Sequence, residues 1–508
     1  NPTGTGGILP GFTGTFTTGR AVPNSTVNVQ ADNAYKDAET RYHQLGGVHK
    51  FAALDLDWNV YKSNSKSNYS GQRNFGFTAR GIGYTVDQRV RSDFPIVTQT
   101  AGPSIAELSS FTDNRYRIDR RAGWDAYRGV SINGRKSFNA PLPSYVKFGV
   151  KIREQRRVLE ASQWSGNYIG PDGVMGVNPA TGRNDDDLAQ FGLIERGQLY
   201  TDEVRFPNVP VPAFPGHTNK LIDGAVESNP RLFLQETAAN VQAQLTGDQK
   251  FKERIPAAYL MGNVQIGRLS ILAGVRVERT KTEGEGARQA ITPEERARRL
   301  AFVGTLTDAE IRRRTLAEYS GRQVRTGDYQ NVLPGVHFKF ALSPRLITRL
   351  SYATNIGRPG IGQLIPRTNV NFENQTITSS NPSLKPQTAD NFDLGVEYYF
   401  EPAGVVSVGV FQKEIKNFIF TSGGASVPAG EDNGFNGDYA GYSLTTQYNG
   451  GSAKVRGLEL NYNQQFTFLP GIFGGLGAYA NYTRMESKGN YGAGNSIAVA
   501  PNPKGKVA

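Results

Sequence analysis

The stretch FDLGVEYYFEPAGVVSVGVFQKEIKNFIF at residues 392–420 reads as two strands joined by a turn at 401–404. Every second position of the first strand is apolar, and these positions are Phe392, Leu394, Val396, Tyr398 and Phe400. Asp393 and Glu397 lie between them, so one face of the strand is apolar and the other is charged. After the turn, apolar residues again alternate with small or polar ones at Val406, Val408 and Val410. Such a hairpin is typical of a membrane barrel with a wet interior.

The same alternation recurs elsewhere in the chain, at residues 54–60, 146–152, 269–277, 336–342 and 458–462. One half-apolar strand occurs in any antiparallel sheet, but six in one chain favour a barrel. Opposite the aliphatic face of 146–152 stand Lys147 and Lys151, which the core of a soluble sandwich rarely tolerates. We expect about 13 to 14 strands. The parity of the apolar positions breaks near Gly81, which predicts a bulge or a corner there.

Composition excludes several classes of protein. Only 38% of the 508 residues are hydrophobic, and no run approaches the roughly 18 to 20 apolar residues of a transmembrane helix. A β-barrel tolerates such a composition because every second strand residue faces water. Cysteine is absent, so there is no disulfide framework and no thiolate metal site. The net charge of +12 comes without a zinc finger or an RNP-like motif, so we expect no nucleic-acid partner, and the charge either attracts anionic lipid or is ordinary solvated charge.

The expected connections between strands fall into two sizes. Short ones rich in Gly, Pro or Ser are expected at residues 139–144, 267–268, 343–345, 401–404 and 468–471. Long ones are expected at 161–247, 280–328, 354–388 and 420–440. If the two sizes alternate strictly, all short turns lie at one end of the barrel and all long loops lie at the other end.

The long connections contain further recognisable elements. Thr292 and Thr307 are each followed three residues later by a glutamate, Glu295 and Glu310, as in the capping box that begins a helix. The arginines of these two helices either form a basic outer surface or are balanced by neighbouring glutamates, and we expect the second. The aspartates at 185–187 are contiguous, whereas a calcium loop spaces its ligands, so we expect an exposed acidic turn and no metal site.

Catalytic patterns are absent from the sequence. The four histidines are isolated, and no HExxH, GxSxG or P-loop motif occurs. Asp55 and Asp57 share one strand face, and we expect this pair to line a hydrated interior. We therefore expect no catalytic residue, no metal, no cofactor and no enzymatic activity. Aromatic residues in the long connections (Trp164, Tyr168, Phe372 and Phe435) suit sugar stacking as well as loop packing, so the ligand-binding residues stay unknown.

Four segments together resemble the TonB-dependent receptors, particularly the large-barrel group associated with uptake of carbohydrate and other nutrients. The segments are LPGVHFKFALSPRLITRLSYATNIGRPG (333–360), NPSLKPQTADNFDLGVEYYF (381–400), VSVGVFQKEIKNFIF (406–420) and KVRGLELNYNQQFTFLPG (454–471). The positions that carry the resemblance are Arg358, Pro359, Asn381, Pro382, Leu384, Pro386, Glu397, Tyr398, Tyr399, Gly457 and Glu459.

This resemblance implies an all-β fold, a 22-stranded transmembrane antiparallel barrel with long extracellular loops that contain short helices. It also implies a place in the cell outer membrane, amid lipid and lipopolysaccharide, and import of a nutrient driven by the TonB complex through an N-terminal plug. Because no plug and no closing aromatic strand are recognisable, we expect residues 1–508 to be a partial outer-membrane barrel domain. The alternatives are a passive porin, a structural barrel component of a complex, or a soluble polysaccharide-binding β-protein.

Overall fold

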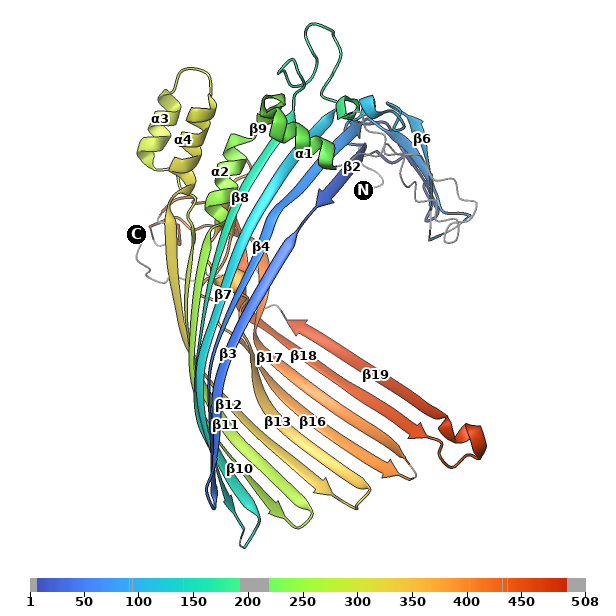
Figure 1. Cartoon of the computed structure of the whole chain (residues 1–508), viewed down its shortest axis with the longest axis vertical. Coiled ribbons are helices and arrows are strands. Elements are labelled where there is room, and N and C mark those ends of the chain that lie inside the picture. The colour runs from blue at the N-terminus through green and yellow to red at the C-terminus, as the bar shows by residue number, and fades with distance from the viewer. Residues whose placement is uncertain are drawn as a thin grey trace.

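The computed structural model describes residues 7–90, 92–93, 95–139, 141–191, 219–401, 403–431, 433–435 and 437–490. One large, strongly curved and almost wholly antiparallel sheet runs through this part of the chain (Figure 1). Its strands of eight or more residues are β2 (Thr26–Asn33), β3 (Lys36–Lys50), β4 (Leu54–Arg80), β7 (Asp113–Phe138), β8 (Ser144–Tyr168), β10 (Gln249–Ile266), β11 (Leu269–Ala287), β12 (Arg322–Ala341), β13 (Leu346–Gly357), β16 (Gln387–Phe400), β17 (Gly404–Ser426), β18 (Ser443–Gln465) and β19 (Gly477–Asn490). These thirteen strands of the described residues agree with the expected 13 to 14, and the all-β prediction is confirmed.

The strands follow one another in the sheet in nearly the order of the sequence. The path runs β2-β4-β7-β8-β10-β11-β12-β13-β16-β17-β18, with β3 also paired to β4 and β19 paired to β18. In the hairpin that β16 and β17 form, Phe400 pairs with Gly404 and Leu394 pairs with Val410. The register therefore places the apolar positions of both strands on one face, as predicted.

Short and long connections alternate along the sheet, which confirms the predicted arrangement. The hairpin turns gather at the lower end of Figure 1, while the helices and long connections gather at the upper end. Two details differ from the prediction. The connection from β18 to β19 spans residues 466–476 and contains the 3-10 helix η4 (Gly471–Gly475). In addition, β8, β11 and β17 continue beyond the expected starts of the long connections at 161, 280 and 420. The strands stay paired there beyond the last alternating apolar residue, because apolar alternation is needed only where one face of the strand contacts lipid.

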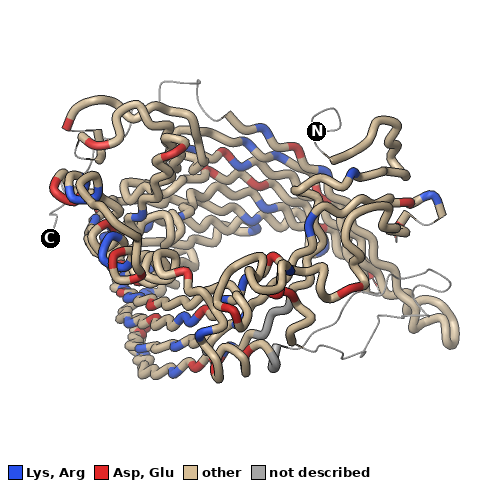
Figure 2. Tube along the Cα trace, turned by 90° about the horizontal axis from the view of Figure 1, so that it is seen from above, with Lys and Arg blue, Asp and Glu red and all other residues tan. Residues whose placement is uncertain are grey.

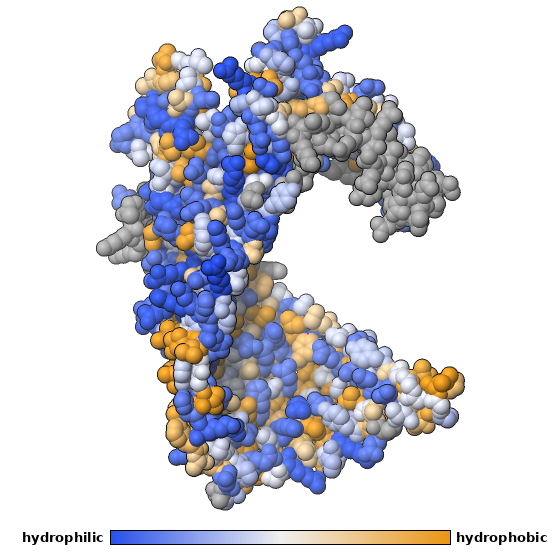
Figure 3. Space-filling model, in the orientation of Figure 1, coloured by the Kyte–Doolittle hydropathy of each residue, from blue (hydrophilic) through white to orange (hydrophobic). Residues whose placement is uncertain are grey.

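The outer face of the sheet carries a belt of exposed apolar side chains. Neighbouring strands place Leu350, Leu394 and Val410 in register, and these side chains are 49%, 43% and 43% exposed. Phe148 and Val150 of β8 are similarly exposed. Hydrophobic residues gather in the lower part of the molecule, whereas the upper strand ends and helices are mostly hydrophilic (Figure 3). So large a continuous apolar surface is expected of a face that contacts lipid.

Charged residues of both signs are distributed along the strands (Figure 2), and ion pairs form between neighbouring strands on the opposite, inner face. Arg349 of β13 donates to Glu397 of β16 across 3.1 Å, and Arg153 of β8 contacts Glu253 of β10 across 3.0 Å. Charged residues therefore alternate with the apolar belt, as the sequence predicted, and in these two pairs the opposite charges neutralise each other across neighbouring strands.

The chain turns a corner at Gly81, between β4 and a small second sheet. Gly81 has a φ of +72°, a conformation that glycine adopts without steric cost. The small sheet consists of β1 (Phe16–Gly19), β5 (Gly83–Asp87) and β6 (Ile96–Ala101). On either side of the corner, Phe77 and Ile82 are buried in one hydrophobic cluster. The predicted break in the alternation is thus confirmed. It is a corner, and the residues on both sides of it belong to a packed core.

The same cluster fills the upper end of the sheet. It is covered by η1 (Leu108–Ser110), η2 (Leu188–Phe191), α1 (Asn219–Ser228), η3 (Pro230–Leu232), β9 (Phe233–Gln235) and the neighbouring α2 (Thr237–Gly247). Trp164 and Tyr168 lie in strand β8, and their rings pack 6.2 and 5.5 Å from the ring of Phe233. These two aromatic residues are therefore packing residues of a strand and not loop residues, because β8 continues past 161.

The helices α3 (Pro293–Ala301) and α4 (Asp308–Tyr319) form between β11 and β12. The hydroxyls of Thr292 and Thr307 accept from the backbone N–H groups of Glu295 and Glu310, which confirms the predicted caps. The Glu295 carboxylate also accepts from three arginines, namely Arg298, Arg299 and Arg313. Together with Arg314, which pairs with Glu310, four of the six helix arginines are therefore balanced by glutamates, as expected. No helix among the described residues has the length and apolar character needed to cross a membrane.

Candidate functional site

The connection from β13 to β16 folds back onto the inner face of the sheet. It contains α5 (Ile361–Leu364), β14 (Thr368–Asn371) and β15 (Thr376–Ser379). Leu364, Ile365 and Leu384 are buried there against Phe251 of β10. Backbone approaches backbone so closely that a Cβ atom on Gly286 of β11 would lie 2.0 Å from the Pro366 carbonyl oxygen. We call residues 358–386 the inner segment, because it occupies the interior beside β10, β11 and β12.

Six of the family-motif positions lie in the inner segment. Arg358 donates to Glu278 of β11, a carboxylate that also accepts from Arg276 at 2.6 Å. The Asn381 side chain donates to the Gln447 carbonyl at 2.8 Å and accepts from the Ser383 N–H at 3.0 Å, so it ties the segment to β18. The other four motif positions contribute packing or cavity wall, and they are Pro359, Pro382, Leu384 and Pro386.

The remaining motif positions lie apart from the inner segment. Tyr399 donates to Glu397 at 2.9 Å on the inner face, whereas Tyr398 stands on the outer face and is exposed. The ring of Phe411 covers Gly457, where a Cβ atom would lie 2.5 Å from the ring. Glu459 is an exposed position of β18, two residues further along. Six motif residues thus lie in the inner segment, and the other five lie in strands β16 and β18.

A cavity opens at the upper end of the inner segment. Its walls come from the connection that follows β11, from β12, from β18 and from the connection between β17 and β18, and the inner segment supplies the rest. Three arginines line it, namely Arg288, Arg325 and Arg367, against the single carboxylate of Asp438. The rings of Phe435 and Tyr439, whose centroids are 5.9 Å apart, form an aromatic wall. The lining is therefore cationic and partly aromatic.

Arg325 is the most buried of these arginines, with 7% of its surface exposed. Its guanidinium donates to the adjacent Val324 carbonyl at 3.2 Å, and among the described residues no carboxylate forms an ion pair with it. The hydroxyl of Tyr448, also in the wall, is buried without a hydrogen-bond partner. A buried cation without a counter-ion is costly, and a carboxylate, sulfate or phosphate group supplies the missing charge in bidentate geometry.

The sequence offered only a faint signal for this cavity. Arg325 shares the inner face of β12 with His337 and Lys339 by parity, but the arginine is distant in sequence from both Arg288 and Arg367. Only the folding back of the inner segment brings the three cations together. Of the two aromatic loop positions predicted in this region, Phe435 does line the cavity, whereas Phe372 is exposed outside the wall.

The prediction of an exposed acidic turn at 185–187 is wrong. Asp186 and Asp187 are 2% and 5% exposed, because the turn packs against the core through the fully buried Leu188. Asp172 approaches Asp185 and Asp186 from the other side of the loop. Three adjacent aspartates predict solvent exposure, but Leu188, which follows them, packs into the core and draws Asp186 and Asp187 into the interior.

The family model described as "TonB dependent receptor-like, beta-barrel" matches residues 1–507. No curated protein matches the chain. Similar solved structures include the alcaligin outer membrane receptor FauA from Bordetella pertussis, at 12% identity and a TM-score of 0.38 over 94% of this chain and 60% of that one. Another is the ferric-catecholate import receptor Fiu from E. coli K12, at 11% identity and a TM-score of 0.37 over 95% of this chain and 62% of that one. The chain therefore spans less than two thirds of the length of these receptors.

Proposed function

Because the chain belongs to the family of TonB-dependent receptor β-barrels, we propose that it forms the barrel of a receptor that imports a nutrient into the periplasm. It is a protein of the Gram-negative outer membrane, and its family consists of transporters and receptors rather than enzymes. In this proposal residues 1–508 are a barrel domain in contact with lipid and lipopolysaccharide. Coupling to the TonB complex runs through a plug outside these residues.

The cationic cavity supports an anionic solute as the cargo. The main support is the buried Arg325 guanidinium. It has no carboxylate partner in the described part of the chain, and it shares the cavity with Arg288 and Arg367. Charge-assisted hydrogen bonds from arginine to an acidic group contribute about 1.5 to 3 kcal/mol each. An acidic group of the cargo that enters this cavity gains that energy and relieves the unpaired charge.

Carbohydrate is the cargo class that suits the rest of the wall. The rings of Phe435 and Tyr439 offer apolar faces of the kind that stack on sugar rings, while Asn381, Ser379 and Thr446 offer hydrogen-bonding groups. We therefore propose an acidic carbohydrate, or another large anionic solute, as the imported nutrient.

The test uses the full-length receptor in cells and after purification in detergent. Uptake of a labelled oligogalacturonide is compared with uptake of the same oligosaccharide after reduction of its carboxyl groups, in cells with and without the TonB complex. We expect TonB-dependent uptake of the acidic form alone. Uptake without TonB, together with a large single-channel conductance, would support the passive porin instead.

Binding by two arginine variants then locates the site. Arg325→Gln is expected to weaken binding of the oligogalacturonide by about 10- to 100-fold, since one charge-assisted contact is lost. Arg279→Gln is the matched control, because Arg279 is an exposed arginine already paired with Asp328 at 2.6 Å. Equal affinities for both variants would reject the cavity as the binding site.

A further inference from the structure

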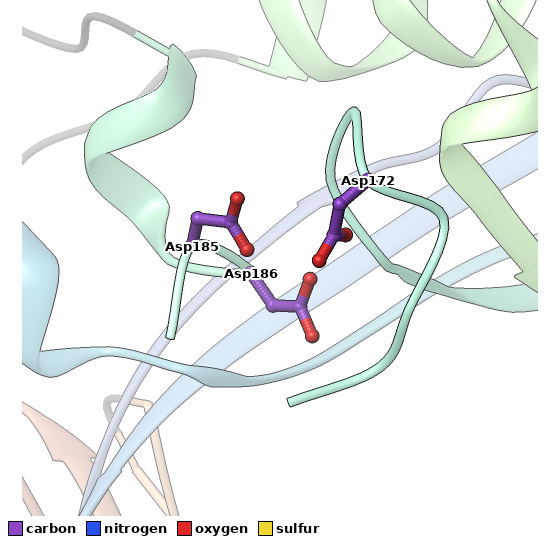
Figure 4. Close-up of side chains that lie close together, drawn as sticks. All are labelled: Asp172, Asp185 and Asp186. Carbon is purple, nitrogen blue, oxygen red and sulfur yellow. The ribbon is translucent and has the colours of Figure 1, made fainter. Parts of the chain in front are cut away.

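The loop that follows β8 brings three carboxylates together at the upper end of the sheet. A bridge between Val177 and Asn184 closes the loop, so the residues on both sides of the bridge come close. The carboxylate oxygens of Asp172, Asp185 and Asp186 lie within 4.8 Å of one another. Figure 4 shows the three side chains converging on a common space from two strands of the loop.

Each of the three carboxylates uses one oxygen to hold its position. Asp172 accepts from the Val174 N–H at 3.0 Å, and Asp185 accepts from the Asn178 side chain at 2.8 Å. Asp186 accepts from the Gly176 N–H at 2.5 Å. In every case the bonded atom is one oxygen of the pair, and the partner oxygen is free for another ligand.

The other oxygen of each carboxylate has no donor among the described residues. In that part of the chain, Asp172 Oδ2, Asp185 Oδ1 and Asp186 Oδ1 are buried and lack a hydrogen-bond partner. Two of them converge on one point, because a Cβ atom on Gly170 would lie 3.5 Å from both Asp185 Oδ1 and Asp186 Oδ1. Buried acceptors in proteins nearly always have a partner, so three orphaned oxygens around one space indicate a missing one.

Asp186 is held in this place by the core of the protein. It is 2% exposed, its carbonyl accepts from the Asn114 side chain at 3.1 Å, and the N–H of the nearby Leu188 donates to the Phe111 carbonyl at 3.1 Å. Asn114 also bonds to the backbone of Tyr168 in both directions, at 3.0 and 2.6 Å. The orphaned oxygen therefore belongs to a rigid part of the loop.

Electrostatics also call for a positive partner. Among the described residues no lysine or arginine forms an ion pair with Asp172, Asp185 or Asp186. Burial, aided by the neighbouring carboxylates of Asp185 and Asp172, raises the pKa of Asp186. Three carboxylates this close repel one another unless a cation or a proton intervenes.

We propose that Asp172, Asp185 and Asp186 bind a single Ca²⁺ ion. All the donors are oxygen atoms, which favours a hard cation over zinc or copper. Two oxygens on one Ca²⁺, at its usual 2.3 to 2.6 Å, are at most about 5 Å apart, in agreement with the observed 4.8 Å limit. Calcium takes six to eight oxygens in flexible geometry, so water and loop carbonyls complete the shell more readily than in the strict octahedron of Mg²⁺. The ion joins the two sides of the loop and fastens it to the top of β8.

The test measures binding of the metal alone to the purified full-length protein in detergent, after removal of metals with a chelator. Isothermal titration with Ca²⁺ is expected to give one site per chain, with a dissociation constant of about 0.1 to 1 mM, as in extracellular calcium modules. Luminescence of Tb³⁺ bound at the same site is expected to be displaced by Ca²⁺ far more effectively than by Mg²⁺.

Two single substitutions and a control discriminate ligation from general charge. Asp186→Asn and Asp172→Asn are each expected to weaken Ca²⁺ binding at least tenfold. Asp187→Asn removes the same charge from the adjacent buried residue, whose carboxylate accepts from the Ala189 N–H instead, and is expected to change affinity less than twofold. Folding of each variant is checked by its heat-dependent migration on a gel. If Asp186→Asn does not fold, Asp172→Asn still tests the proposal, because Asp172 is less buried.

Two results would overturn the proposal. The first is that the unmodified protein shows no saturable Ca²⁺ binding even at a Ca²⁺ concentration about 10-fold above the upper limit of the expected dissociation constant. The second is an equal loss of affinity in Asp187→Asn and Asp172→Asn, which would mean that the loop attracts cations only through its net charge.

Discussion

Substitution of Gly286 by alanine is expected to release the inner segment from the sheet while the strands stay intact. The new Cβ atom would lie 2.0 Å from the Pro366 carbonyl oxygen and 3.1 Å from Cγ2 of Ile365. Both neighbours belong to the inner segment, and the nearer one is a backbone atom that cannot rotate away. The segment must therefore move, and the buried side chains beside it, Leu364 and Ile365, move with it.

The size of the effect follows from those two side chains. Full burial of a leucine or an isoleucine contributes about 1.5 to 3 kcal/mol each, so complete detachment of both costs at most about 3 to 6 kcal/mol. Expressed as an equilibrium between closed and open segment, this is a factor of about 10² to 10⁴. Amide hydrogen exchange in residues 361–365 is expected to accelerate by up to that factor.

The assay combines hydrogen exchange with limited trypsin digestion of the purified protein. We expect faster exchange in the inner segment and faster cleavage after the exposed Arg367. Gly262→Ala is the matched control, because Gly262 is also a strand glycine but its Cβ would meet only the Tyr145 carbonyl oxygen, at 3.7 Å. If Gly286→Ala and Gly262→Ala behave alike, the close packing of the segment on β11 is refuted.

Three further predictions concern the loops. Thr292→Ala and Thr307→Ala each remove a hydroxyl that accepts at 3.3 Å from the helix backbone, so each is expected to destabilise its helix by about 1 kcal/mol. The loss is measured as faster amide exchange in α3 or α4, and Thr→Ser at the same positions is the neutral control. Burial acts to raise the pKa of Glu295, but hydrogen bonds from Arg299 and Arg298 outweigh it and lower the pKa. The stability that Glu295 contributes is then present above the unfolded pKa of about 4.3 and is lost as the pH falls through the lower folded pKa. Protection of the amides in α3 and α4, corrected for the pH dependence of the intrinsic exchange rate, is therefore expected to fall below about pH 4, and to fall less in Glu295→Gln. Burial raises the pKa of Asp186, which faces the carboxylates of Asp185, Asp172 and Asp187, so Ca²⁺ affinity is expected to fall as the pH falls toward the ordinary aspartate value of about 3.9, and an affinity that stays constant from pH 7 down to that value would contradict this.

The fold was largely predictable because lipid imposes a strict rule on sequence. One face of every spanning strand must be apolar, so the alternation at Leu394 or Val410 identifies both the strand and its direction of exposure. The strand ends were not predictable in the same way. Beyond the lipid zone β8, β11 and β17 continue as paired strands, but their side chains there contact other parts of the protein instead of lipid, as Trp164 and Tyr168 contact Phe233, so the apolar alternation no longer marks the strand.

The candidate sites were much less visible in the sequence. The helix caps were predictable because Thr292 and Glu295 act through local contacts. Arg288, Arg325 and Arg367 come from three different elements, and only the inner segment places them around one cavity. The carboxylates of Asp172 and Asp186 likewise meet through a loop closure that spacing does not encode. Local rules predict local structure, whereas convergence of distant side chains depends on tertiary packing.

The arginines of the inner face provide the strongest argument that the cavity binds a ligand. Several other arginines on that face have carboxylate partners, as in the pairs Arg153 with Glu253, Arg276 with Glu278 and Arg349 with Glu397. Neutralisation within the protein is therefore the ordinary solution for a guanidinium in this interior. Arg325 departs from it at a more buried position, where the cost of an unpaired charge is greater. We therefore propose that the counter-ion of Arg325, which the described residues do not supply, comes from an anionic cargo.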